Sequence, residues 1–116
     1  QNNSSYMKFC KDTLADILKE VILIYDKDDK YNKIELIIFA NELICQVEKD
    51  EKVVYRREME VESDIDLVIG FNTKYLISLL DFFDNKMLDL YLTDDLSPAK
   101  IQTEDRLAVI MPIRLI

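Results

Sequence analysis

Several residue types are scarce or absent in this sequence, and each absence excludes a class of active site. The 116 residues include no histidine, which excludes Ser-His-Asp and Cys-His nucleophile systems and zinc sites that use imidazole. The only glycine, Gly70, excludes the glycine-rich phosphate loops of P-loop and dinucleotide-binding proteins. No apolar run reaches the ~18 residues that a membrane-spanning helix needs. We therefore expect no cofactor, no metal site and no enzymatic activity.

Cysteine is also rare. Cys10 and Cys45 each lie in an apolar stretch, and two cysteines are too few for a disulfide framework. No signal-peptide pattern opens the chain. The sequence therefore predicts two buried, reduced thiols and a cytoplasmic location.

Carboxylates, by contrast, are plentiful. Asp28-Asp29 and Asp94-Asp95 lie between apolar runs, where aspartate commonly stabilises a turn by accepting hydrogen bonds from the backbone. A carboxylate-dependent enzyme that uses Asp94, Asp95 and Glu104 is the least favoured alternative. Its minimum requirement is divalent-metal binding, which calorimetry would detect.

Length and composition indicate one globular domain. A content of 49% hydrophobic and 33% charged residues is ordinary for a folded domain. We expect a disordered tail or tether over residues 1–5 and a single domain over residues 6–116. Because the chain begins with Gln1 rather than methionine, we expect a fragment of a longer protein. The net charge of −8 predicts repulsion of nucleic acid unless the cations gather on one face.

The first half of the chain predicts one strand, one helix and three further strands. The strand covers Tyr6–Phe9, and Asp12 or Thr13 is expected to cap the helix that follows. The apolar stripe of this helix consists of Leu14, Ile17, Leu18 and Val21, and Ile22, Leu23 and Ile24 extend it. This apolar excess is either core or a contact with a partner. The three further strands are expected at Ile34–Phe39, Leu43–Val47 and Val53–Val61, with hairpin spacing.

The second half repeats this order. A shift of 62 residues aligns Phe9 with Phe71 and Leu14 with Leu76. The repeat has a strand at Leu67–Phe71, a helix capped by Asn72 or Thr73, a stripe at Leu76, Leu79, Leu80 and Phe83, and strands at Leu88–Leu92, Ala99–Ile101 and Leu107–Met111. Two such copies predict an α+β domain with pseudo-two-fold symmetry, in which each copy packs its helix on its own sheet.

The apolar C-terminal tail has two interpretations. Pro112 interrupts it, and proline cannot donate to a strand ladder, so a central strand is not expected beyond Met111. The tail is then either the edge of the core or part of a surface that receives another molecule.

Three motifs resemble those of a known bacterial family. They are Gly70–Leu76 (GFNTKYL), Leu92–Ala99 (LTDDLSPA) and Val109–Leu115 (VIMPIRL). They resemble the patterns GFN-x-x-YL, LTD-x-x-SP and MPMRL in the C-terminal (third) domain of the bacterial sliding clamp, the β subunit of DNA polymerase III. The resemblance implies the DNA-clamp fold and a non-catalytic processivity factor. In that family, two three-domain subunits form a dimeric ring that encircles duplex DNA.

The resemblance also implies sites. Replicative and repair polymerases and the clamp loader would bind through short linear motifs in a hydrophobic peptide pocket between the second and third domains. Its lining would include Tyr31, Asn72, Tyr75, Leu96, Pro98, Val109, Met111, Pro112, Ile113 and Arg114. Ile22 and Leu23 would lie in the dimer interface, and Lys11, Lys19 and Lys74 would face DNA.

Some features of the sequence depart from this pattern. The helical lysines lie among acidic residues, so we expect this domain alone to bind DNA weakly. Ile113 replaces a common methionine, and Ile116 extends past the usual terminal leucine. A stand-alone interaction domain of clamp fold that forms no ring is the alternative.

Overall fold

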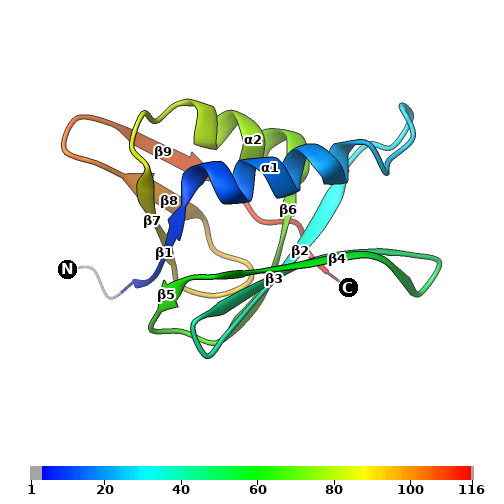
Figure 1. The fold of residues 1–116 in the computed structure, drawn as a ribbon, viewed down its shortest axis with the longest axis horizontal. Coiled ribbons are helices and arrows are strands. Elements are labelled where there is room, and N and C mark those ends of the chain that lie inside the picture. Colours follow the sequence, from blue (N-terminus) through cyan, green and yellow to red (C-terminus); the bar gives the residue numbers. More distant parts are fainter. Residues whose placement is uncertain (1–3, 116) are drawn as a thin grey trace.

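A computed structural model describes residues 4–115 as two antiparallel sheets with two helices on one side of them (Figure 1). The helices are α1 (Lys11–Ile22) and α2 (Thr73–Asp81). The expected tail at residues 1–5 lies mostly outside the described residues, and Ser5 already belongs to strand β1 (Ser5–Cys10). None of the helices in residues 4–115 is long and apolar enough to cross a membrane.

The predicted strands are present, with small differences at their ends. They are β2 (Lys33–Phe39), β3 (Glu42–Lys49), β4 (Lys52–Glu60), β6 (Leu67–Asn72), β7 (Met87–Leu92), β8 (Ala99–Gln102) and β9 (Leu107–Ile110). The short strand β5 (Glu62–Ser63) was not expected.

The two halves of the chain exchange strands. One sheet has the order β5-β1-β7-β8-β9 and the other has the order β4-β3-β2-β6. In the first sheet, β1 of the first half pairs with β7 of the second, and Cys10 lies opposite Met87. In the second sheet, β6 pairs with β2, and Asn72 lies opposite Lys33. The duplicated α+β fold is confirmed, but the expectation of one separate sheet for each half is wrong because each sheet contains a strand from both.

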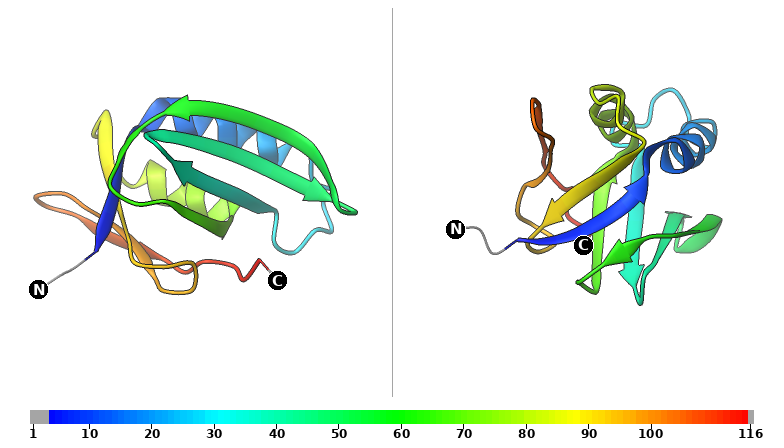
Figure 2. Two further views of the ribbon diagram at one scale, coloured as in Figure 1. Left: turned by 90° about the horizontal axis from the view of Figure 1, so that it is seen from below. Right: turned by 60° about the vertical axis from the view of Figure 1, so that its left-hand side comes forward.

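Both helices bury their predicted stripes against the sheets. Figure 2 shows α1 and α2 on the same side of the strands, and the two helices contact each other. All four stripe positions of α1 and the four of the second repeat, including Phe83 just past α2, are buried. They join Phe9 and Phe71 in one hydrophobic core shared by both halves.

The predicted cap of α1 is wrong. The helix begins at Lys11, directly after β1, and its N-cap Cys10 makes no capping hydrogen bond through its side chain. The Lys11 amide instead donates to the Lys86 carbonyl at 2.8 Å, so the neighbouring chain satisfies one of the unpaired N–H groups of the first turn. Asp12 and Thr13 lie inside that turn.

The two cysteines differ in environment. Cys45 is fully buried, and burial raises the pKa of its thiol to about 12. Cys10 is only half-buried at the start of α1, where a hydrogen bond with the Thr13 side chain lowers its pKa. The prediction of a buried thiol is therefore confirmed for Cys45 and wrong for Cys10, because β1 ends there at the surface.

Glu20 joins α1 to β4. Its Oε1 accepts hydrogen bonds from the Tyr55 hydroxyl at 2.6 Å and from Arg57 Nη1 at 2.8 Å. The bond from Tyr55 lowers the pKa of the Glu20 carboxyl below its ordinary value of 4.5, and the Arg57 charge adds to the effect. Such a carboxyl stabilises the fold above its unfolded-state pKa, and this contribution disappears as the pH falls through the folded-state pKa.

We therefore expect the unfolding free energy of Glu20→Gln to fall less than that of the wild type as the pH is lowered from about 5 to about 2. Chemical denaturation at several pH values measures the effect as a flatter profile of unfolding free energy. Asp16→Asn is the matched control, because Asp16 is exposed on the same helix and makes no ion pair among the described residues. If the unfolding free energy of Glu20→Gln depended on pH as steeply as that of the wild type, Glu20 would not contribute to the acid sensitivity of the fold.

Candidate peptide-docking groove

An open groove lies between α2, β9 and the segment that follows β9. Its volume is about 960 Å³. All of its lining residues except one are uncharged. They are Lys30, Tyr31, Asn72, Tyr75, Ser78, Leu79, Phe82 and the continuous run 107–113.

The first wall of the groove is a second face of α2. Tyr75, Ser78, Leu79 and Phe82 follow the spacing i, i+3, i+4, i+7, beside the core stripe that begins at Leu76. Tyr75 is 66% exposed and Phe82 is 48% exposed, so this face offers apolar surface to a ligand. The same periodicity in the sequence could have revealed Ser78, Leu79 and Phe82, which the motif resemblance missed.

Asn72 holds the beginning of α2 and lies at the rim of the groove. Its Oδ1 accepts hydrogen bonds from the Lys74 amide at 2.9 Å and the Tyr75 amide at 3.2 Å, so of the two predicted caps, Asn72 and Thr73, Asn72 is the one that caps the helix. The carbonyl oxygen is thus occupied, and only the side-chain N–H groups remain for a ligand. Asn72 therefore both positions Tyr75 and offers hydrogen-bond donors.

The opposite wall consists of β9 and the tail. Leu107, Val109 and Met111 are 53–58% exposed, whereas Ile110 is buried. The strand ends at Ile110, one residue earlier than predicted, before Pro112. Val109 and Met111 are therefore surface residues of the groove rather than core residues.

A loop between α1 and β2 forms the third side, and a network of hydrogen bonds fixes it. Asp29 Oδ1 accepts from the amides of Tyr31 at 3.0 Å and Asn32 at 2.7 Å. The Asn32 carbonyl in turn accepts from the Thr73 amide at 3.0 Å and from its hydroxyl. Asn32 is buried and has a φ of 41°, which asparagine tolerates better than most residues. The turn at Asp29 is thus confirmed, and it places Lys30 and Tyr31 beside α2.

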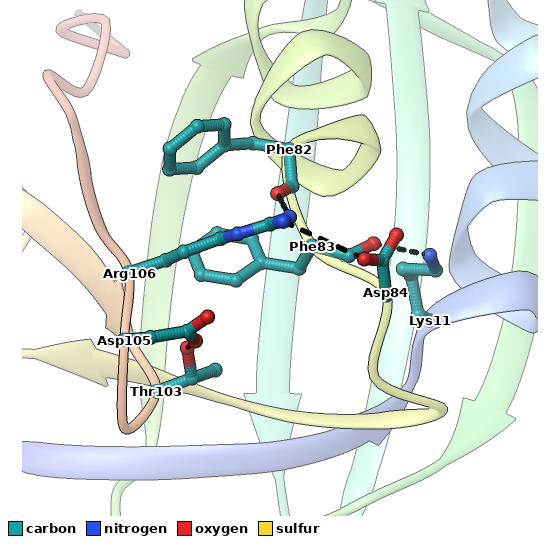
Figure 3. A network of polar contacts seen from close by, with 7 residues as sticks. All are labelled: Lys11, Phe82, Phe83, Asp84, Thr103, Asp105 and Arg106. Atoms are coloured by element: carbon teal, nitrogen blue, oxygen red, sulfur yellow. Dashed lines mark hydrogen bonds and ion pairs between the residues drawn. The ribbon is translucent and has the colours of Figure 1, made fainter.

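Cations cap the C-terminal end of α2 at the far end of the groove (Figure 3). Arg106 donates to the Phe82 carbonyl, lies over the Phe82 ring at 5.5 Å and pairs with Asp84 at 3.6 Å. Lys11 donates to the Phe83 carbonyl. These contacts satisfy carbonyls that the helix leaves unpaired, and they hold the Phe82 ring at the groove.

Three of the residues expected in the pocket lie elsewhere. Leu96 and Pro98 are exposed in the loop between β7 and β8 and do not line the groove. Their loop is a turn in which Asp94 Oδ1 accepts from the Leu96 and Ser97 amides, as predicted for an aspartate turn. These bonds lower the pKa of Asp94.

Arg114 lines a second, charged hollow of about 710 Å³, which borders the groove at Tyr31 and Ile113. The groove thus contains seven of the ten residues that the resemblance implied. Ile116 lies outside the described residues.

The other residues singled out by the sequence lie on and just after the helices. Leu23, just after α1, is 84% exposed, and Ile22 is half-buried. Lys19 and Lys74 are exposed and make no side-chain ion pair among the described residues, whereas the Lys11 ammonium is occupied by the Phe83 carbonyl. In residues 4–115 no group of three or more histidine, cysteine or acidic side chains could hold a metal ion.

Two strand-exchanged sheets with two helices on one side define a domain of the DNA-clamp fold. A family model described as "DNA polymerase III beta subunit, C-terminal domain" matches residues 1–114. The chain therefore belongs to the DNA polymerase III β subunit family, the β sliding clamps, as a C-terminal domain. The members of this family are non-catalytic processivity factors, which confirms the prediction that the chain is not an enzyme.

Individual relatives agree with this assignment. A beta sliding clamp from Pseudomonas putida is 33% identical over 92 residues, which are 76% of this chain and 25% of that protein. The DNA polymerase III subunit beta from Pseudomonas aeruginosa has a TM-score of 0.85 at 23% identity and is matched over 99% of this chain and 32% of that chain. The Bartonella birtlesii sliding clamp bound to griselimycin has a TM-score of 0.87 at 20% identity, over 98% and 31% respectively. This chain spans about a quarter of the curated relative and about a third of the solved chains.

Proposed function

We propose that this chain is the peptide-docking domain of a sliding clamp and that its groove binds short linear motifs of replicative and repair polymerases and of the clamp loader. The observation that carries the proposal is the exposed apolar lining contributed by two of the family motifs. Tyr75 comes from the first motif, and Val109 and Met111 come from the last. Exposed apolar surface concentrated in one groove is typical of an interaction site.

The chemistry of the groove suits a peptide with apolar anchors. Burying a leucine or phenylalanine side chain of a partner contributes about 1.5–3 kcal/mol. Met111 adapts its shape to different anchors, which suits a site with several partners. The free N–H groups of Asn72 and the Tyr75 hydroxyl supply directional contacts to the peptide backbone.

The role in a ring is part of the same proposal. Two subunits of the longer protein would form a homodimeric ring around duplex DNA in the cytoplasm, with Ile22 and Leu23 in the interface between subunits. The 84% exposure of Leu23 supports an apolar contact there. Lys19 and Lys74 would face the DNA, which the ring retains by encirclement rather than by tight binding.

A titration of the 116-residue chain with two ligands tests this function. We expect a short peptide with one leucine and one phenylalanine as its only apolar residues to bind with a Kd of about 0.04–6 mM, because two anchors contribute about 1.5–3 kcal/mol each, or about 3–6 kcal/mol together. NMR shift changes should map to Tyr75, Val109 and Met111. The same peptide with both anchors changed to alanine should not bind.

A short DNA duplex is the second ligand. We expect no tight, salt-sensitive binding of the duplex at physiological salt in fluorescence anisotropy, because the chain carries a net charge of −8. Absence of peptide binding would overturn docking by this domain, and tight duplex binding would overturn the proposal that encirclement replaces affinity.

A further inference from the structure

The wall of the groove that contains Met111 is attached to the second sheet at a single point. After Pro112 the tail leaves the first sheet and meets the free edge of β6, where Ile113 and Gly70 form an isolated antiparallel bridge. The Ile113 amide donates to the Gly70 carbonyl at 2.7 Å. Within residues 111–115, this is the only main-chain hydrogen bond to another part of the chain that the structure shows.

Gly70 is the residue that allows this close approach. Its φ is not positive, so its backbone does not itself require glycine. A Cβ added at this position would lie 2.6 Å from Leu115 Cδ2 and 3.0 Å from the Ile113 carbonyl oxygen. The Leu115 side chain could rotate away, but the Ile113 carbonyl belongs to the backbone and could only move together with the tail.

We infer that Gly70 is a positioning residue for the docking groove. It acts through the tail, because the bond to Ile113 and the packing of Leu115 over its Cα hold Met111, Pro112 and Ile113 in the groove wall. A side chain at position 70 pushes the tail away from β6 and moves this wall relative to Tyr75. The inference rests on the proposed peptide docking for its effect on affinity, while the attachment itself is a property of the fold.

The attachment is tested without a ligand. In Gly70→Ala we expect the amide of Ile113 to exchange with solvent about tenfold faster or more, because a local opening of the tail becomes easier. The amides of core strands such as β2 should keep their protection. Gly70→Val should increase the exchange of Ile113 further. Val68→Ala, a change on the exposed face of the same strand, is the control and should leave Ile113 unaffected.

The effect on docking is measured with the leucine–phenylalanine peptide. We expect about three- to tenfold weaker binding in Gly70→Ala, since a displaced wall loses part of the contact with one anchor. Leu115→Ala removes the atom nearest to the added Cβ. In the double variant with Gly70→Ala, this second change should therefore weaken binding less than it does alone, which is the sign of a direct coupling between the two positions.

The outcomes separate the two proposals. Unchanged exchange of Ile113 in Gly70→Ala and Gly70→Val would overturn the role of Gly70, whatever the peptide does. Faster exchange with unchanged peptide affinity would also overturn it, because the tail would then be attached without positioning the groove. If the wild-type chain bound no peptide while Ile113 responded as expected, the proposed docking function would fail and the attachment would stand.

Discussion

Alanine at Tyr75 or at Met111 is expected to weaken binding of the leucine–phenylalanine peptide by about tenfold or more, because each side chain covers a peptide anchor. The two residues lie on opposite walls of the groove and are 66% and 58% exposed in the free chain. Each substitution removes apolar contact without opening the core. The same NMR titration measures the affinity of each variant.

The fold should survive both changes, and this must be shown separately. The unfolding free energy of each variant should lie within about 0.5 kcal/mol of the wild type, as is usual for exposed positions. Phe39→Ala is the matched control, because Phe39 is an aromatic residue with 62% exposure at the end of β2, outside the groove lining. Unchanged affinity in both groove variants would refute the assignment of this groove as the docking site.

The second large effect concerns the core shared by the two halves. Phe9 and Phe71 occupy equivalent positions in the two repeats, and both are fully buried. We expect Phe9→Ala and Phe71→Ala each to lower the free energy of unfolding by about 3–5 kcal/mol, since each leaves a cavity in a packed interior. Denaturant unfolding, followed by circular dichroism, measures both.

Unfolding of both variants should remain a single cooperative transition. Each sheet contains a strand from the other half, so neither half can keep its sheet when the other unfolds. Phe39→Ala again serves as the control and should change stability by no more than about 0.5 kcal/mol. Two separate unfolding transitions, or a lower free energy of unfolding in only one of the two variants, would contradict a shared core.

Much of the fold could be predicted because its signals are local. The spacing of Leu14, Ile17 and Leu18 reflects one helical turn and does not depend on what the helix packs against. The cap at Asn72 is equally local, since it involves only the next three residues. The predicted cap of α1 was wrong because the partner is not local. The Lys11 amide donates to the carbonyl of Lys86, which is distant in the sequence.

The exchange of strands between the halves could not be predicted in this way. A repeated order of elements is compatible with two separate sheets or with two mixed ones. Only the pairing of β1 with β7 and of β2 with β6 decides between them. That pairing joins residues from different halves of the chain, and periodicity contains no information about it.

The groove, too, has residues that the sequence could predict and residues that only long-range contacts place there. The resemblance predicted seven of its residues, with Tyr31 lying outside the three motifs, whereas Lys30 is brought into the groove only by contacts between residues distant in the sequence. Lys30 is placed by the Asn32–Thr73 hydrogen bond. Leu96 and Pro98 belong to a matching motif, yet the turn at Asp94 places them outside the lining.

The sequence by itself determined the elements, the duplication, the family and the apolar character of the tail, because each depends on residue types at short or repeated spacing. The tertiary structure decided what the tail does. Leu107 and Val109 are exposed while Ile110 is buried, because successive side chains of a strand point to opposite faces of the sheet. The last segment can approach β6 closely because Gly70 has no side chain there. In the sequence, Gly70 excluded phosphate loops and opened the first family motif. Its contact with the tail appears only in the structure, since only folding brings position 70 against Ile113 and Leu115.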